Sequence, residues 1–278
     1  MVRPLRIEIP GGFYHIMSRG NAKAPVFIND ADRTKFIDIL AKTVHDYGWL
    51  CHTYCLMGNH YHLLIETPEA NLSAGMHLLN GMYTQAFNSR HQRTGHVFEG
   101  RFRSNLVEKG SYLLELTRYI VLNPVRAGLT ESPEEYRWSS YNATCGNLTP
   151  PGFLHTTWIL EQFGSSSSRS ISAYINFVND KSAISRVDME SPSQIIGSEV
   201  FVETMTTQAQ QALPATGYPG PKKMIDRMGL DELFGTRPLT KTERNLRVIR
   251  AFQEFGYSKT EIAAATGMHL SSIGRIIR

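Results

Sequence analysis

The stretch Met57-Gly58-Asn59-His60-Tyr61-His62-Leu63-Leu64-Ile65-Glu66 decides the fold. It predicts a turn at Gly58-Asn59 followed by a strand. Side chains two positions apart in a strand point to the same face, so the imidazoles of His60 and His62 can converge on one ion. Imidazole is a common ligand of divalent metals. The ordinary alternative for His-x-His alone is a pair of half-buried strand histidines without a metal, so the rest of the chain has to decide.

The segments around this strand predict an α+β fold. Residues 50–56 form a strand that pairs with the histidine strand as an antiparallel hairpin, and residues 13–19 and 102–107 form two more. Helices are expected after Asn29, after Asn71 and from Tyr112 to Asn123, where Pro124 ends the last one. The order strand, helix, strand, strand, helix, strand, helix is the ferredoxin-like pattern with one added helix. We therefore expect an antiparallel sheet with helices on one face.

The composition is that of a globular protein, with 278 residues and 41% hydrophobic content. Residues 241–278 carry 7 basic and 3 acidic side chains, an excess equal to the whole net charge of +4. Three cysteines are too few for a disulfide framework and favour a reducing compartment. Since neither a signal peptide nor a membrane span is evident, we expect a cytoplasmic protein without a membrane partner.

Tyr119 and Asn123 are four residues apart in the last predicted helix, so their side chains share one face. A half-buried aromatic residue with a hydrated hydroxyl is the ordinary interpretation of such a tyrosine. Tyr112, Tyr136 and Tyr141 are rival nucleophiles by residue type, but none has an asparagine one turn later. The combination of His-x-His with Tyr119 and Asn123 favours a catalytic site.

With these residues in place, the sequence resembles the HUH single-tyrosine transposases, most closely the REP-associated tyrosine transposases of bacteria. The resemblance covers roughly residues 1–145 in detail and extends more loosely through residues 158–178 and 197–201. The matching stretches are Tyr14-His15-Ile16-Met17-Ser18-Arg19-Gly20-Asn21, Leu56-Met57-Gly58-Asn59-His60-Tyr61-His62-Leu63-Leu64, Gly95-His96-Val97-Phe98-Glu99-Gly100-Arg101-Phe102, Tyr112-Leu113-Leu114-Glu115-Leu116-Thr117-Arg118-Tyr119-Ile120-Val121-Leu122-Asn123-Pro124-Val125-Arg126-Ala127-Gly128 and Trp138-Ser139-Ser140-Tyr141.

The resemblance implies that His60 and His62 are metal ligands, that Asn123 is the third ligand and that Tyr119 is the nucleophile. It also implies Mg²⁺ or Mn²⁺ as the cofactor and single-stranded hairpin DNA as the substrate. Such an enzyme cleaves and rejoins the strand through a covalent 5′-phosphotyrosine. The sequence departs from the family at Gly58, where proline is common, and this change affects the turn rather than a ligand.

Elementary chemistry agrees with these roles. A tyrosine hydroxyl has an ordinary pKa near ~10 and is a poor nucleophile at neutral pH unless charge is stabilised in the transition state. A divalent ion held by two imidazoles and an amide can polarise the scissile phosphate. The covalent intermediate conserves the phosphodiester energy, consistent with the lack of a Gly-x-x-x-x-Gly-Lys-Ser/Thr loop for ATP.

Two other metal sites are conceivable. A hydrolase of the His-x-His-x-Asp-His type needs aspartate at position 64, where this chain has Leu64. A structural zinc site formed by Cys51, Cys55, His60 and His62 has suitable ligand types but lacks the usual knuckle spacing. Small core residues are the expected role of both cysteines.

Arg19, Arg101, Arg103 and Arg126 lie near the predicted site and are candidates for contacts to phosphates of single-stranded DNA. A solvated surface charge is the alternative for each of them.

The C-terminal stretch predicts three helices, of which the last two resemble a helix-turn-helix. The first, residues 242–255, is expected to cover the others through Leu246, Ile249 and Phe252. The second helix of such a motif enters the major groove, and a packing hairpin is the alternative. The residues predicted to face duplex DNA are Ser271, Ser272, Arg275 and Arg278.

We thus expect four regions: a catalytic domain over 1–145, a helical extension over 146–212, a linker over 213–239 and a helix-turn-helix module over 240–278. The predicted function is that of a metal-dependent transposase, either monomeric or homodimeric. The alternative is a domesticated DNA-binding protein or regulator in which the catalytic residues are vestigial. A protein of that kind would keep its function after Tyr119→Phe.

Overall fold

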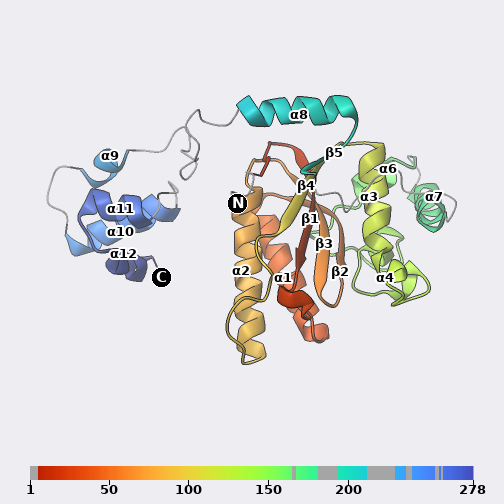
Figure 1. The fold of residues 1–278 in the computed structure, drawn as a ribbon, viewed down its shortest axis with the longest axis horizontal. Helices are drawn as coiled ribbons and strands as arrows, with labels where there is room; N and C mark the ends of the chain where they lie inside the picture. The colour runs from red at the N-terminus through yellow and green to blue at the C-terminus, as the bar shows by residue number, and fades with distance from the viewer. Residues whose placement is uncertain are drawn as a thin grey trace. The chain divides into compact units, whose positions relative to one another are not determined.

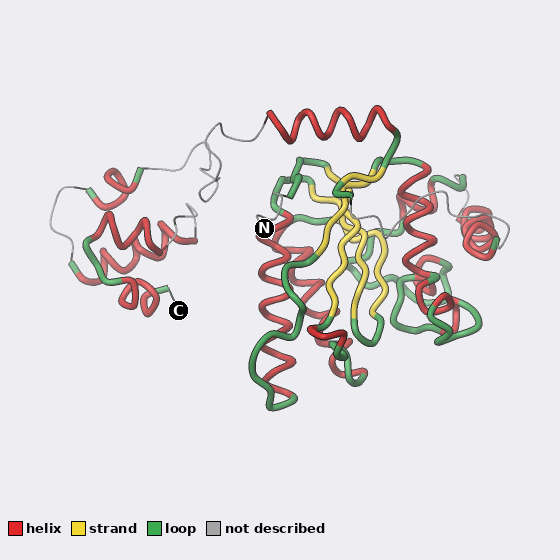
Figure 2. The backbone as a smooth tube through the Cα atoms, viewed as in Figure 1, coloured by secondary structure: helices red, strands yellow, loops and turns green. Residues whose placement is uncertain are grey.

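The structure, a computed structural model, describes residues 6–164, 167–180, 193–211, 229–235, 240–253, 257 and 259–277. The chain forms two compact units, residues 1–207 and 208–278. The first unit contains one sheet with the strand order β2-β3-β1-β4-β5 (Figure 2). Its strands are β1 (Gly12–Arg19), β2 (Leu50–Leu56), β3 (His60–Thr67), β4 (Arg103–Val107) and β5 (Ile195–Ile196). The first four strands pair antiparallel, which confirms the ferredoxin-like pattern predicted from the sequence.

The fifth strand was not predicted. Ile195 and Ile196 pair parallel with Leu106 and Val107 of β4, so the sheet is mixed rather than antiparallel throughout. Both isoleucines are buried. The region 146–212, expected to be a purely helical extension, therefore contributes an edge strand to the catalytic sheet.

Helices cover both faces of this sheet, and the expectation of helices on one face is wrong. In Figure 1, α1 and α2 lie on one side of the strands and α3 lies on the other. α3 follows β4, and its apolar stripe packs on the face opposite α1 and α2. The helices of this unit are α1 (Asp30–Tyr47), α2 (Leu72–Arg90), α3 (Ser111–Val121), α4 (Asn123–Arg126), α5 (Tyr141–Thr144), α6 (Thr157–Glu161), α7 (Ser167–Asn179) and α8 (Glu199–Gln211), with 3-10 turns at Asn21–Lys23 and Pro133–Glu135.

Two hydrophobic clusters fill the two faces, because alternate residues of each strand point in opposite directions. The first cluster, which we call the main core, contains Ile16 of β1 and Leu63 of β3 packed against α1 and α2. The second contains Phe13 and Leu64 from the same strands packed against α3. His15, His60 and His62 occupy positions of the alternation that face this second side.

The break between α3 and α4 positions the end of α3. The helix predicted from Tyr112 to Asn123 ends earlier, since α3 ends at Val121, and α4 starts at Asn123 with Pro124 in its first turn, a position that proline tolerates. α3 and α4 thus carry Tyr119 and Asn123 on either side of this junction. α1 begins at a capping box in which the Asn29 side chain accepts from the Asp32 amide, and it ends at Gly48, which is left-handed with φ 64°.

The described part of the second unit contains the helices α9 (Leu230–Phe234), α10 (Lys241–Gln253), α11 (Lys259–Thr266) and α12 (Leu270–Ile276). Three of them match the helices predicted for this end of the chain. α9 was not predicted and lies within the expected linker, where Leu233 and Phe234 are buried in the core of the unit. Residues 213–228 and 236–239 of the expected linker lie outside the described residues.

The face of α10 that packs inward differs from the predicted one. Val248 and Ala251 are buried, whereas Leu246 is 58% exposed and Phe252 is 36% exposed. The reason lies in α9, since Arg247 of α10 donates to the backbone oxygens of Leu233 and Phe234 and turns this side of the helix toward α9. Residues 254 and 255, the predicted end of this helix, lie outside the described residues.

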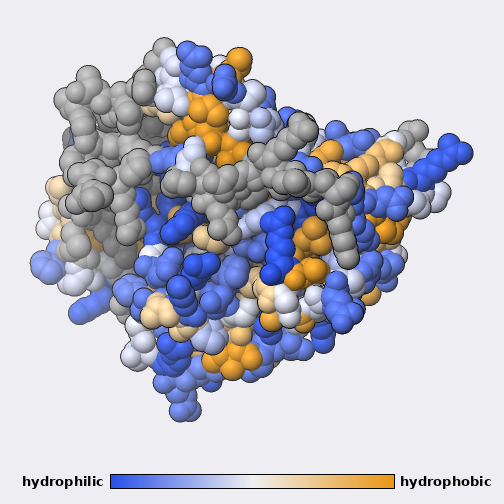
Figure 3. Space-filling model, turned by 45° about the vertical axis from the view of Figure 1, so that its right-hand side comes forward, coloured by the Kyte–Doolittle hydropathy of each residue, from blue (hydrophilic) through white to orange (hydrophobic). Residues whose placement is uncertain are grey.

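The face of the molecule in Figure 3 is mainly hydrophilic, with hydrophobic residues in small separate groups. Among the described residues, no helix has the length and apolar character needed to span a membrane.

Candidate active site

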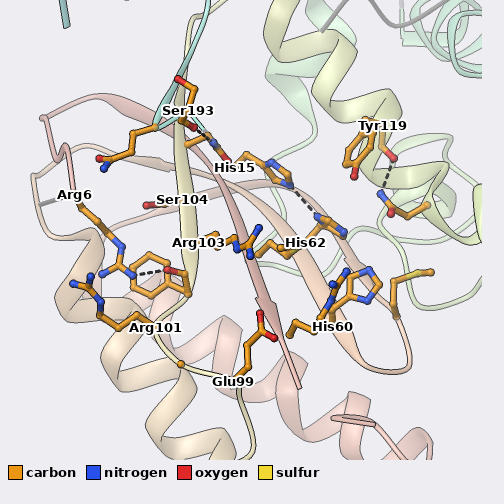
Figure 4. A pocket seen from close by; sticks show the side chains of 18 of the residues that line it. Arg6, His15, His60, His62, Glu99, Arg101, Arg103, Ser104, Tyr119 and Ser193 are labelled. Carbon is orange, nitrogen blue, oxygen red and sulfur yellow. Dashed lines mark hydrogen bonds between the residues drawn. The ribbon is translucent and has the colours of Figure 1, made fainter. Parts of the chain in front are cut away.

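His60 and His62 lie on β3 and share the sheet face that α3 covers, as the alternation predicts. Their rings are 5.1 Å apart between centroids and nearly perpendicular. Arg19 of β1 is the register partner of His60, and Met17 is the partner of His62. In Figure 4, His60 and His62 of β3 lie on one side of a hollow and Tyr119 of α3 lies on another.

Each of the two histidines has its Nδ1 atom engaged in a hydrogen bond. His60 Nδ1 lies 2.7 Å from Asn59 Oδ1. His62 Nδ1 lies 2.9 Å from Nε2 of His15, a buried contact marked by a dashed line in Figure 4. These contacts leave Nε2 of both rings as the atom available to a ligand.

The turn that carries Asn59 is held by the loop after β1. The Asn59 side-chain amide donates to the Lys23 backbone oxygen at 3.2 Å, and the Gly20 backbone amide donates to the Asn59 backbone oxygen at 2.8 Å. A side chain at Gly20 would not fit, because its Cβ would lie 2.0 Å from the Ala24 oxygen. The position of His60 therefore depends on the Gly20-to-Ala24 loop as well as on its own strand.

Tyr119 and Asn123 meet these histidines from the opposite side. The Tyr119 ring lies 5.7 Å from the His62 ring and 6.0 Å from the His15 ring, in both cases edge to face. The Asn123 side-chain nitrogen donates to the Tyr119 backbone oxygen at 2.9 Å, which leaves its Oδ1 as an acceptor or ligand. Arg126 stacks its guanidinium over the Tyr119 ring at 4.9 Å. The structure thus brings together all four residues predicted to carry the chemistry.

A cavity of about 880 Å³ connects these groups. All four arginines predicted to contact DNA line it: Arg19, Arg101, Arg103 and Arg126. Glu99 is the acidic residue among its described lining residues. An excess of guanidinium groups over carboxylates makes this cavity suited to a polyanion.

Burial keeps the histidines of the site neutral. Desolvation lowers the pKa of His15 to about 4, and desolvation together with Arg19 lowers the pKa of His60 to about 4. The pKa of His62 is well below its ordinary value, first because of burial and then because of the neighbouring His15, His60 and Arg19. A neutral imidazole is the form that binds metal, so no proton has to leave near neutral pH.

The donor atoms fit the metal predicted from the sequence. Two imidazole nitrogens and one amide oxygen each have their other polar atom tied by a hydrogen bond, which orients the donor atom. In the described part of the chain, no group of three His, Cys, Asp or Glu side chains is arranged to hold a metal. Any ion at this site would therefore rely on the amide of Asn123.

The alternative sites are not supported. Cys51 belongs to the main core and Cys55 to the cluster on the opposite face, so the two thiols do not converge with His60 and His62. Burial raises the pKa of both thiols, to about 12 for Cys51, which disfavours the thiolate that zinc requires. Position 64, where a hydrolase of the His-x-His-x-Asp-His type needs an aspartate, is occupied by the fully buried Leu64.

The rival tyrosines are engaged elsewhere. Tyr136 donates its hydroxyl to the Leu56 backbone oxygen, Tyr141 donates to Glu134, and Tyr112 packs at the border of the second cluster. Among the described residues that line the cavity, the one tyrosine is Tyr119.

Sequence reasoning missed several lining residues, four of which bear on the site. His15 was quoted only as part of a matching stretch, although its position two residues before Met17 on β1 places it opposite the His-x-His strand. Arg6 stacks over the Phe102 ring at 3.5 Å and lines the cavity, and no sequence signal marked it. Ser193 and Gln194 reach the cavity because they precede β5, which the sequence did not reveal.

The residues predicted to bind duplex DNA lie in the second unit. Ser271 and Arg275 of α12 are exposed and Ser272 is partly exposed. The His269 side chain caps the helix by accepting from the Ser271 amide. Arg278 lies outside the described residues.

Residues 10–123 match the family model described as IS200-like transposase. This stretch contains strands β1 to β4, both histidines, Tyr119 and Asn123, and it resembles IS200-like transposases. Over these residues the match confirms the resemblance predicted from the sequence. Curated proteins include no match to this sequence.

Solved structures show weaker likenesses. One is a REP-associated tyrosine transposase bound to a REP hairpin, at 16% identity over 56% of this chain and 92% of that chain, with a TM-score of 0.47. A putative transposase from Deinococcus radiodurans R1 is 15% identical over 49% of this chain and 98% of that chain, with a TM-score of 0.31. A tRNA(His) guanylyltransferase from Saccharomyces cerevisiae is 12% identical over 64% of this chain and 84% of that chain, with a TM-score of 0.35. Because every score is below 0.5, none of these likenesses assigns an activity.

Proposed function

We propose that the protein is a metal-dependent DNA strand transferase that cleaves and rejoins single-stranded hairpin DNA through Tyr119, in the manner of REP-associated tyrosine transposases. The observation that carries this proposal is the meeting of Tyr119, His60, His62 and Asn123 in one arginine-lined cavity. The match of residues 10–123 to the model of IS200-like transposases supports DNA as the substrate.

The arginines act before the chemistry. Guanidinium groups of Arg19, Arg101 and Arg103 would hold backbone phosphates on both sides of the scissile one, which fixes the strand for attack in line with the leaving oxygen. Single-stranded DNA suits the site because a cavity of about 880 Å³ admits a few nucleotides and is too small for a duplex.

The Tyr119 hydroxyl oxygen then attacks the phosphorus of the scissile phosphodiester. The new P–O bond is a 5′-phosphotyrosine, the bond from phosphorus to the 3′ oxygen breaks, and this oxygen takes up a proton as the tyrosine proton is lost. Mg²⁺ or Mn²⁺ bound by His60, His62 and Asn123 would supply Lewis-acid polarisation of the phosphate. Arg126, stacked on the tyrosine ring, holds the ring in position and adds positive charge beside the attacking group.

Attack by a free 3′-OH on the phosphotyrosine reverses these bond changes and joins the strand to a new end. The same site therefore serves cleavage and joining, and no nucleotide triphosphate is required.

Adduct formation tests this proposal. Purified protein is incubated with labelled single-stranded hairpin oligonucleotides in Mg²⁺, in Mn²⁺ or in EDTA and resolved on a denaturing gel. We expect a metal-dependent protein-DNA band that disappears in Tyr119→Phe and persists in the control variant Tyr136→Phe, which alters a tyrosine outside the cavity. Retarded complexes on native gels without an adduct on any hairpin would favour the binding-protein alternative.

The second unit adds a further proposal, that α11 and α12 form a helix-turn-helix that binds duplex DNA. Ile262 and Ile273 are buried between the helices and Gly267 is left-handed at the turn, with φ 66°. Exposed Arg275 supports a phosphate or guanine contact. A gel-shift series with a random duplex library should therefore select a sequence in the wild type and lose selectivity in Arg275→Ala.

A further inference from the structure

His15 is placed to control the chemical state of His62. It lies in the middle of β1, next to β3, and its ring lies edge to edge with the His62 ring and nearly coplanar with it, with centroids 5.2 Å apart and planes 14° apart. His15 Nε2 and His62 Nδ1 are 2.9 Å apart. Both rings are almost fully buried, at 3% and 2% exposure. Water therefore cannot replace this contact.

A hydrogen bond between two neutral imidazoles has two possible directions, and they are not equivalent for His62. If His62 Nδ1 carries the proton and donates, its Nε2 has a lone pair that can bind a metal. If His15 Nε2 carries the proton instead, the remaining proton of His62 sits on Nε2 and blocks it. The partner of Nδ1 thus decides whether His62 can be a ligand.

The neighbouring histidine has a defined hydrogen-bond direction. The Asn59 side chain donates through its nitrogen to the Lys23 oxygen, so the atom it turns to His60 is an oxygen, which can only accept. His60 therefore carries its proton on Nδ1 and has its lone pair on Nε2. His62, two residues along the same strand, needs an acceptor in the equivalent position, and His15 is the group found there.

We propose that His15 is a positioning residue that accepts the His62 Nδ1 proton and so holds His62 in the tautomer whose Nε2 binds the metal. This inference rests on the proposed function, because it assumes that His62 is a ligand. In this tautomer the His15 proton is on its own Nδ1, an atom that is buried and has no hydrogen-bond partner among the described residues. A group that hydrogen-bonds to a metal ligand in this way typically contributes about 10- to 100-fold to metal affinity.

Metal binding to three full-length variants tests the inference, with free Mn²⁺ measured by electron paramagnetic resonance. His15→Leu keeps an apolar side chain of similar size but removes the acceptor, and we expect the Kd for Mn²⁺ to rise about 10- to 100-fold. His15→Gln presents an amide oxygen in place of Nε2, and we expect it to stay within about threefold of the wild type. His52→Leu is the matched control, since it removes another fully buried imidazole that bonds to Glu66 and does not line the cavity.

A folded His15→Leu variant with an unchanged Kd would overturn the role of His15, as would a folded His15→Gln variant that binds as weakly as His15→Leu. If His15→Leu does not fold, nitrogen chemical shifts of ¹⁵N-histidine in the metal-free wild type decide, because a proton on His62 Nε2 contradicts the inference. The reference variant His62→Ala separates this result from the proposed function. Equal Mn²⁺ binding by wild type and His62→Ala would refute the metal site itself, while the measured tautomer would still decide the role of His15.

Discussion

The two faces of the central strands β1 and β3 differ in the kind of side chain that they bury. On one face Ile16 and Leu63 are buried in the main core between the sheet and α1 and α2. One residue away along the same strands, His15 and His62 point to the other face, where they meet Tyr119. Residues of the main core and residues of the proposed catalytic site thus alternate along the same two strands. Substitutions at neighbouring positions should therefore have separable effects on stability and on activity.

Leu63→Ala should have the largest effect on stability. Leu63 is fully buried in the main core, and truncating such a leucine costs about 2–5 kcal/mol. The fraction that remains folded should form the adduct as the wild type does, because the side chain points away from the cavity. Urea titration gives the stability, and adduct yield per folded molecule gives the activity. A loss of activity larger than the loss of folded protein would show that the two faces are coupled.

Acid should lower the stability of the protein through the other face of the sheet, which carries the buried histidines. The pKa of His15 is about 4 in the folded protein against 6.5 for an ordinary histidine. As pH falls below the ordinary value the unfolded chain binds the proton first, so stability is complete above it and decreases toward the folded pKa. The expected loss from this one residue is on the order of 3 kcal/mol.

The matched variant for this acid effect is His15→Gln, which keeps a polar side chain that does not titrate. Its unfolding free energy in EDTA should vary less with pH between these two values than that of the wild type. Parallel pH profiles for the two proteins would show that the acid sensitivity arises elsewhere.

Arg101→Ala should affect binding without affecting either face of the sheet. Arg101 is exposed at the rim of the cavity, so its loss should weaken binding of a single-stranded oligonucleotide about tenfold at low salt. The slope of log Kd against log salt should fall by about 1, as for the loss of one phosphate contact. Arg137→Ala, an exposed arginine outside the cavity, is the control. An unchanged salt slope in Arg101→Ala would remove it from the DNA path.

Asn29→Ala should have the smallest effect, and it tests whether a change on the main-core face of the sheet alters the histidine face. It removes the capping box of α1, which packs on the main core, and should cost about 1 kcal/mol of stability. Its adduct yield and Mn²⁺ affinity should equal those of the wild type. Altered metal affinity would mean that α1 influences the histidine face through the sheet.

Much of this arrangement could be predicted from the sequence because it depends on local patterns. The alternation of residues 60–66 fixes which side chains share the histidine face, and the four-residue spacing of Tyr119 and Asn123 fixes their common side of the chain. The Asn-Pro step indicates where α3 ends. These features need only the geometry of a strand, a helix and a proline.

The remainder depends on contacts between distant residues. A two-residue strand such as Ile195-Ile196 is too short to show a period, and the face of the sheet that α3 covers is decided by packing. In α10, Leu246 and Phe252 have the spacing of buried residues, yet the bonds from Arg247 to α9 select Val248 and Ala251 instead. The contact between His15 and His62 needs the register of β1 against β3, which no single segment reveals.

The late edge strand has a consequence for how the protein is made. β5 is anchored beside β4 by the bond from the Ser198 amide to Glu108, residues that are 90 positions apart in the chain. During synthesis the four antiparallel strands, both histidines of β3 and Tyr119 emerge well before this partner does. Loop closure over such a distance is slow, and an unpaired edge invites association with other chains. We therefore expect the newly made sheet to pass through a stage in which the residues of the proposed site are all present while the outer edge of β4 is still open.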